Sequence, residues 1–211
     1  AKNGVKYNEK GAWELVDRLS EAFQYYLLRA SCDIAKEKGK CEGFERTKYA
    51  EGLLPIDHYK KEIDEIVPHK QRMAWESLRK DIAKYGLRHS TLSAQMPSES
   101  SSVVSNETNG IEPPRAMLQI KKSKKGPLKQ IAPGFPKLKN DYTLLWDMPS
   151  NEGYINVVAM MQKYFDQAIS GNWSYNPLQF ENNEVPLSVM AQDMLTAYKY
   201  GWKTSYYQNT Y

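Results

Sequence analysis

The sequence has few of the residues from which metal sites and disulfides are built. Among its 211 residues, Cys32 and Cys41 are the two cysteines, they form no CxxC motif, and only three residues are histidine. A structural zinc site lacks ligands in such a chain. We therefore expect two reduced thiols in a cytoplasmic protein and no bound metal.

Long apolar runs are also missing. No stretch reaches the roughly 18–20 apolar residues of a membrane span, and no secretory signal opens the chain. The net charge of +4 is too small to predict binding to nucleic acid. The chain starts at Ala1 without a methionine and stops abruptly at Tyr211. We interpret it as a piece of a longer protein.

What is present indicates a folded chain. Hydrophobic residues make up 41% and charged residues 26%, and the aromatics include 15 Tyr and 5 Trp. Such a chain can bury a large core, and its length suits one domain of mixed architecture better than two. We treat residues 1–211 as a single segment.

Apolar side chains at three- and four-residue spacing predict a long amphipathic helix over 11–38, ended by Gly39. The residues expected on its apolar face are Trp13, Val16, Leu19, Phe23, Tyr26, Leu27, Ala30 and Ile34. Further helices are predicted over 53–67 with Asp57 as N-cap, 72–85 before Gly86, 140–148, 151–170, and 186–200 with Pro186 at its start. The methionines and aromatics of 151–170 are read as core.

Strands are predicted over 87–96, directly after Gly86, and over the final segment 202–211. Residues 116–133 read as a hairpin with a polar tip at 123–126. The lysines of that tip indicate a solvated turn, with a basic patch as the alternative. Helices alternating with strands favour an α/β layer arrangement.

The stretch "MPSESSS" (96–102) is a candidate anion site. It lies where the predicted strand ends and where "SSSVVS" starts a short helix. Such a junction exposes backbone N–H groups that suit a phosphate, and serine hydroxyls add small donors. The alternative is a capping turn whose hydroxyls satisfy their own backbone. It is not a Walker loop, because the G-K-[ST] ending is absent.

The segment "LRHSTLSAQMPSESSSVVSNETNGIEPPR" (87–115) resembles the substrate-phosphate loop of the large, catalytic subunit of class I ribonucleotide reductases. "QYYLLRAS", "LPIDHYKKEID", "GYINVVAMMQKYFDQAIS" and "DMLTAYKYGWKTSYYQNT" resemble the same family in the same order. The resemblance implies the C-terminal portion of a ten-stranded α/β barrel, helix-rich and incomplete on its own. It also implies that Pro97, Ser98, Glu99, Ser100 and Ser101 hold the phosphates of a ribonucleoside diphosphate.

Tyr206 and Tyr207 are the second candidate site. Neighbouring residues of a strand point to opposite faces, so two half-buried strand tyrosines are the simple interpretation. In the family, two stacked tyrosines here relay an oxidising equivalent toward an active-site cysteine. A phenol suits that role because it loses an electron and a proton together and, with a pKa of about 10, is protonated beforehand.

The resemblance also shows what this chain does not supply. Neither Cys32 nor Cys41 matches a family cysteine, and His89 is read as a strand histidine satisfied by a neighbour rather than as a catalytic one. The implied partners are a metal-containing small (beta) subunit that supplies the radical, a thioredoxin- or glutaredoxin-type reductant, the missing N-terminal half, and a second copy of the complete large subunit. Two explanations stay open: an incomplete sequence, or a natural split subunit. A non-catalytic anion-binding α/β module is the alternative function.

Overall fold

The computed structural model describes residues 1–98, 100–123 and 126–211. Within them the chain forms six α-helices and four strands, joined by loops and short 3-10 turns. The helices are α1 Lys10–Lys38, α2 Pro55–His58, α3 Trp75–Tyr85, α4 Ser101–Ser105, α5 Glu152–Gln162 and α6 Leu187–Tyr200. The strands are β1 Leu118–Ser123, β2 Gly126–Ile131, β3 Gly171–Tyr175 and β4 Ser205–Thr210.

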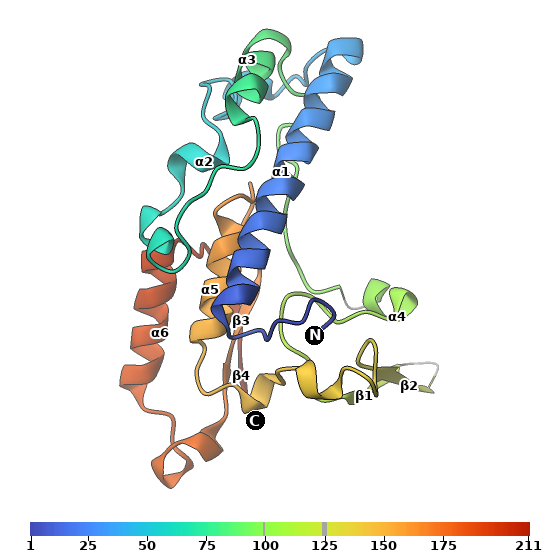
Figure 1. Ribbon diagram of the computed structural model, residues 1–211, viewed down its shortest axis with the longest axis vertical. Coiled ribbons are helices and arrows are strands. Elements are labelled where there is room, and N and C mark those ends of the chain that lie inside the picture. The colour runs from blue at the N-terminus through green and yellow to red at the C-terminus, as the bar shows by residue number, and fades with distance from the viewer. Residues whose placement is uncertain (99, 124–125) are drawn as a thin grey trace.

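The helix α5 lies at the centre of the fold. It packs between α1 and α6, and the C-terminal half of α1 packs on α3 (Figure 1). Every residue from Gly153 to Met160 is buried, and most of these residues are apolar, as suits a helix that is enclosed on all sides, with Asn156 as the polar exception. The core around it includes Leu28, Trp75, Leu78, Tyr154, Val158, Tyr164 and Ile169. The methionines and aromatics of α5 are therefore core residues, as predicted.

The strands form two separate pairs. The first is the antiparallel hairpin β1–β2, and the second is the parallel pair β3–β4. A single parallel bridge between Gln95 and Ile169 lies outside the named strands. The mixed helix and strand content agrees with the expected α/β class. The described residues form no closed barrel, which is consistent with the expected portion of one, and their four strands do not test the number of strands in the complete barrel.

Several predicted elements are confirmed. The helix over 11–38 is α1, followed by Gly39 at φ 78°. Residues 72–85 contain α3, and 186–200 is α6 with Pro186 as its N-cap. The hairpin and the final strand are present as β1–β2 and β4, although the tip residues 124–125 lie outside the described part of the chain. A short helix also follows the serine motif, as α4.

Other predictions were wrong. The helix over 53–67 is two short pieces, because α2 ends at His58 and a 3-10 turn spans Lys61–Glu65. Asp57 is not the N-cap: it lies in the first turn, where its carboxylate accepts a hydrogen bond from the Leu54 N–H at 2.7 Å. The predicted helix over 140–148 is two 3-10 turns, Lys139–Asp141 and Leu145–Asp147.

Two errors lie next to the candidate site. Residues 87–96 are extended without forming a strand, and the Gln95–Ile169 bridge is their one strand-like contact within the described chain. The helix over 151–170 ends at Gln162, and the unpredicted strand β3 follows at Gly171. Apolar periodicity alone cannot find the end of a helix that is buried on all sides.

The apolar face predicted for α1 is only partly correct. Leu19, Phe23 and Tyr26 are 55%, 52% and 61% exposed. The buried face of the same helix carries polar side chains instead, namely Asp17, Ser20, Glu21, Gln24 and Ser31. Buried polar groups need partners inside the protein. The helix therefore depends on contacts that its own sequence does not show.

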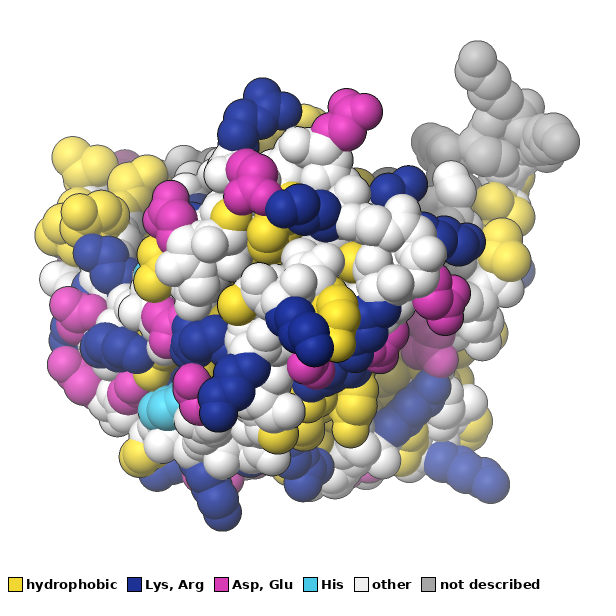
Figure 2. Space-filling model, turned by 90° about the horizontal axis from the view of Figure 1, so that it is seen from above, with side chains coloured by type: hydrophobic (Ala, Val, Ile, Leu, Met, Phe, Trp, Pro, Cys, Tyr) yellow, Lys and Arg dark blue, Asp and Glu magenta, His cyan; other side chains and the backbone are white. Residues whose placement is uncertain are grey.

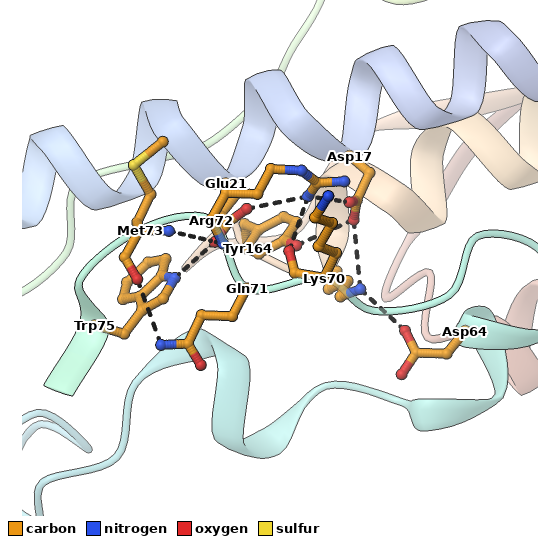
Figure 3. A network of polar contacts seen from close by, with 10 residues as sticks. Asp17, Glu21, Asp64, Lys70, Gln71, Arg72, Met73, Trp75 and Tyr164 are labelled. Carbon is orange, nitrogen blue, oxygen red and sulfur yellow. Dashed lines mark hydrogen bonds and ion pairs between the residues drawn. The ribbon is translucent and has the colours of Figure 1, made fainter.

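Those contacts form a buried cluster of charges between α1, α5 and the segment before α3 (Figure 3). Arg72 Nη1 lies 2.7 Å from the Asp17 carboxylate and 3.1 Å from that of Glu21. Lys163 Nζ lies 3.4 Å from Asp17 and 3.0 Å from Asp64. The Tyr164 hydroxyl donates to Asp17 at 3.0 Å, and burial raises its pKa. The cluster thus joins four segments that are distant in sequence: α1, the end of α5, the segment before α3 and the 3-10 turn that carries Asp64.

On the outer surface, charges of both signs are interspersed. The end of the molecule shown in Figure 2 carries basic and acidic side chains side by side, with apolar side chains between them. Among the described helices, none combines the length and the apolar character that crossing a membrane would require.

Candidate functional site

A cavity of about 380 Å³ lies between the serine motif, the hairpin and the pair β3–β4. Its walls come from five parts of the chain: residues 95–97, residues 107–116, the hairpin with residues 132–133, Tyr154 of α5, and the strand pair with the preceding Ser170. Pro97 and Tyr207 both line it, although they lie far apart in the sequence. The cavity therefore brings one residue of each candidate site to the same space.

Hydrogen bonds to the segment after α5 fix the position of residues 92–95, which lead to the serine motif. The Gln167 N–H donates to the Ser93 carbonyl at 3.0 Å, and the Ser170 N–H donates to the Gln95 carbonyl at 3.0 Å. The Leu92 N–H donates to the Asp166 carboxylate at 2.7 Å. Gln95, near the end of this segment, forms a parallel bridge with Ile169. Pro97 therefore lies beside the start of β3.

The serine motif turns from this extended segment into α4. The Ser102 N–H donates to the Ser98 carbonyl at 2.8 Å, while the Ser100 side chain makes no capping hydrogen bond to the described helix. Ser98 is half-buried, and Ser100 and Ser101 are exposed. The described lining of the cavity includes Pro97 but not Ser98, Ser100 or Ser101. Glu99 lies outside the described residues.

Tyr206 and Tyr207 form a contact pair because β4 carries a bulge. Gly171 pairs with Ser205 and Trp173 pairs with Gln208, so both tyrosines lie opposite the single residue Asn172. A bulge of this kind breaks the alternation of side chains. The two ring centroids are 4.2 Å apart with planes tilted by 55°, and the two residues are 62% and 58% exposed. The two rings therefore meet in a tilted contact.

The two phenols also touch through their oxygens. The Tyr207 hydroxyl donates to the Tyr206 oxygen at 3.5 Å, a long hydrogen bond. This hydrogen bond raises the pKa of Tyr207 above its ordinary value. A phenol with a raised pKa stays protonated over the physiological range.

Sequence reasoning assigned no functional role to three polar residues of the cavity wall. Asn172 is buried and donates through Nδ2 to the Glu112 carboxylate. The Asn172 N–H donates to the Tyr154 hydroxyl at 3.1 Å, and burial, with the nearby charge of Glu112, raises the pKa of Tyr154. Glu112 lies inside the "NGIEPPR" match, which could have drawn attention to it. Asn172 has no such signal, because β3 was not predicted.

Neither cysteine lies in the described lining of the cavity. Cys32 is fully buried in the core, and burial raises its pKa. His89 has a neighbouring partner as predicted, with Nδ1 3.0 Å from the Ser31 hydroxyl. In the part of the chain that the structure describes, no group of three or more His, Cys, Asp or Glu could hold a metal ion.

The chain matches known reductases over its whole length. A family model described as "Ribonucleotide reductase, barrel domain" matches residues 1–143 and 136–208. Over 210 residues the chain is 57% identical to ribonucleoside-diphosphate reductase subunit alpha of Haemophilus influenzae and 52% identical to ribonucleoside-diphosphate reductase 1 subunit alpha of Escherichia coli. Subunit alpha of Enterobacteria phage T4 is 43% identical over 212 residues.

Each of these matches covers 100% of this chain but 28% of the relative. The chain thus spans little more than a quarter of the length of the curated relatives that it matches. The family model covers nearly every residue and confirms the resemblance seen in the sequence. The chain belongs to the ribonucleotide reductase barrel-domain family.

Proposed function

We propose that this chain is part of a ribonucleoside-diphosphate reductase alpha subunit and supplies two elements of its active site. One is the loop Pro97–Ser101, which holds the diphosphate of the substrate, and the other is the Tyr206–Tyr207 pair, which relays the radical. The observation that carries the proposal is the shared cavity, lined by Pro97 from the loop and by Tyr207 from the pair.

The loop binds the diphosphate mainly through its backbone. The motif holds no Lys or Arg, so oriented N–H groups and hydroxyls must provide the attraction. Because the Ser100 side chain does not cap the described helix α4, its hydroxyl is not committed to that role. This favours a loop that binds a ligand over a turn whose hydroxyls only cap their own backbone. In the complete subunit Pro97, Ser98, Glu99, Ser100 and Ser101 together hold the phosphates.

The tyrosine pair is suited to passing an oxidising equivalent. The ring centroids are 4.2 Å apart and the oxygens lie 3.5 Å apart, so an electron and a proton have only a short distance to move between them. Tyr207 lines the cavity, whereas Tyr206 is not among its described lining residues.

The remaining chemistry belongs to the rest of the enzyme. A radical cysteine and a redox-active cysteine pair come from the missing N-terminal half of the subunit. The beta subunit, which contains metal, generates the radical, and a thioredoxin- or glutaredoxin-type protein reduces the enzyme after each cycle. We place this assembly in the cytoplasm, with the complete alpha subunit as a homodimer.

The test is turnover of a complete reductase that contains this segment and its beta subunit. Tyr206→Phe and Tyr207→Phe each remove the oxidisable hydroxyl but keep the ring. Both should reduce deoxyribonucleotide formation to background while diphosphate affinity is unchanged. Tyr26→Phe, at an exposed tyrosine of α1, is the matched control and should keep its activity. Full turnover in either pair variant would show that the pair does not relay the radical, which favours the alternative that this segment only binds an anion and takes no part in the radical chemistry.

A further inference from the structure

We infer that Asn172 is a positioning residue that holds the Tyr206–Tyr207 pair in place and links it to the cavity wall. This inference rests on the proposed function of the pair. The two tyrosines are more than half exposed, so packing against the core does little to fix their rings. Their position is set by the backbone of the bulge from which both side chains project.

Asn172 is the residue opposite the bulge. Its side-chain oxygen accepts a hydrogen bond from the Tyr207 N–H at 3.0 Å. In a regular ladder such an N–H bonds to a backbone carbonyl, but the bulge interrupts the ladder at this point. The side-chain oxygen of Asn172 replaces the missing backbone acceptor and stabilises the bulge.

The same residue also reaches the cavity wall. Its Nδ2 donates to the Glu112 carboxylate, and its backbone N–H donates to the Tyr154 hydroxyl at 3.1 Å. Asn172, Glu112, Tyr154 and Tyr207 all line the cavity. The wall formed by residues 109–115 is therefore joined to the tyrosine pair through one buried side chain.

A carboxamide suits both contacts at this position. Asparagine offers an acceptor oxygen and two donor hydrogens, whereas an aspartate in its charged form offers acceptors alone. The variant Asn172→Asp would keep the bond from the Tyr207 N–H but would place a second carboxylate against Glu112. The double variant Asn172→Asp/Glu112→Gln exchanges the two groups. It restores one donor and one acceptor between the side chains, with the opposite polarity.

The experiment measures kcat and KM of the complete reductase with its beta subunit. Asn172→Ala should lower kcat by up to about 100-fold, because a displacement near 1 Å of a reacting group can cost that much. KM for the diphosphate should change little, since the hydrogen bonds of Asn172 go to Glu112, Tyr154 and Tyr207 and not to the described residues of the phosphate loop. Asn172→Asp should also lower kcat, and Asn172→Asp/Glu112→Gln should recover most of it. Asn140→Ala, at an exposed asparagine, is the control.

The outcomes separate this inference from the proposed function. If Tyr207→Phe abolishes turnover but Asn172→Ala leaves kcat unchanged, the tyrosine relay stands and the positioning role of Asn172 is wrong. If Tyr207→Phe retains full turnover, the relay itself is wrong. If Asn172→Ala raises KM and lowers kcat equally, or the double variant is no better than Asn172→Asp, Asn172 only maintains the fold. Circular dichroism and thermal unfolding of each variant check that the subunit is intact.

Discussion

Gln95 and Ile169 form a parallel β-bridge that ties the segment leading to the serine motif to the start of β3. The hydrogen bond from the Ser170 N–H to the Gln95 carbonyl, at 3.0 Å, extends it. Since β3 pairs with β4, this bridge sets the distance between Pro97 and the tyrosine pair. The geometry of the cavity depends on it.

Substitutions of Ser100 test whether its backbone N–H or its side-chain hydroxyl contributes more to diphosphate binding. Ser100→Ala should weaken affinity by up to roughly tenfold, because a net hydrogen bond contributes about 0.5–1.5 kcal/mol. Ser100→Pro removes the N–H and should weaken it more, and the φ of −87° at Ser100 is close to the range that proline adopts. Diphosphate affinity of the complete subunit is the measurement. Equal losses in the two variants, with the fold intact, would show that the hydroxyl carries the binding.

The chain on its own should have no reductase activity. Hydrogen abstraction and reduction of the substrate need a radical cysteine and a redox pair, and neither Cys32 nor Cys41 matches them. The assay supplies the purified chain with beta subunit, a dithiol and a ribonucleoside diphosphate, and chromatography follows the product. Any deoxyribonucleoside diphosphate above the background of boiled protein would refute the prediction.

The isolated chain should also associate or aggregate. Leu19, Phe23 and Tyr26 expose the outer face of α1, and Leu187 and Leu195 of α6 are 78% and 64% exposed. Apolar patches of this kind mark surfaces that another segment covers. Adding the complementary part of the subunit should reduce light scattering and binding of a hydrophobic dye. A monomeric chain with a sharp thermal transition would argue against this expectation.

The buried charge cluster should make a large contribution to stability. Asp17→Asn leaves Arg72 and Lys163 without one of their carboxylates, and breaking a buried pair costs about 3–5 kcal/mol. Asp33→Asn, in an exposed pair with Lys36 at 2.9 Å, is the matched control and should cost less than about 1 kcal/mol. Denaturant-induced unfolding of the complete subunit measures the loss in free energy of unfolding for each of the two variants. Similar losses would mean that the cluster is dispensable.

The two cysteines should differ in reactivity. Cys32 is fully buried, whereas Cys41 is partly exposed. Burial also raises the pKa of Cys32, so its reactive thiolate forms only at higher pH than for an ordinary thiol. Alkylation with iodoacetamide, followed by mass spectrometry, should modify Cys41 first, and modification of Cys32 should increase as the pH rises from about 7 to about 9. Equal rates at neutral pH would indicate that α1 is not packed.

Local patterns determined much of this protein. The length of α1, the start and end of α6, the β1–β2 hairpin and the final strand all follow from periodicity, Gly and Pro, because these signals act between near neighbours in the chain. The family was also recognisable, since the motif around Pro97 and the "TSYYQNT" segment resemble it closely.

Tertiary structure decided the rest. Residues 87–96 look like a strand but form only the Ile169 bridge within the described chain, because a strand needs a partner that the local sequence cannot specify. The buried side of α1 can hold the charge of Asp17 because Arg72 and Lys163, distant in sequence, neutralise it. Alternation along β4 predicts that Tyr206 and Tyr207 point apart, but pairing with β3 creates the bulge opposite Asn172 and brings the two rings together. Contacts between distant segments, which no local pattern encodes, set the geometry of the site.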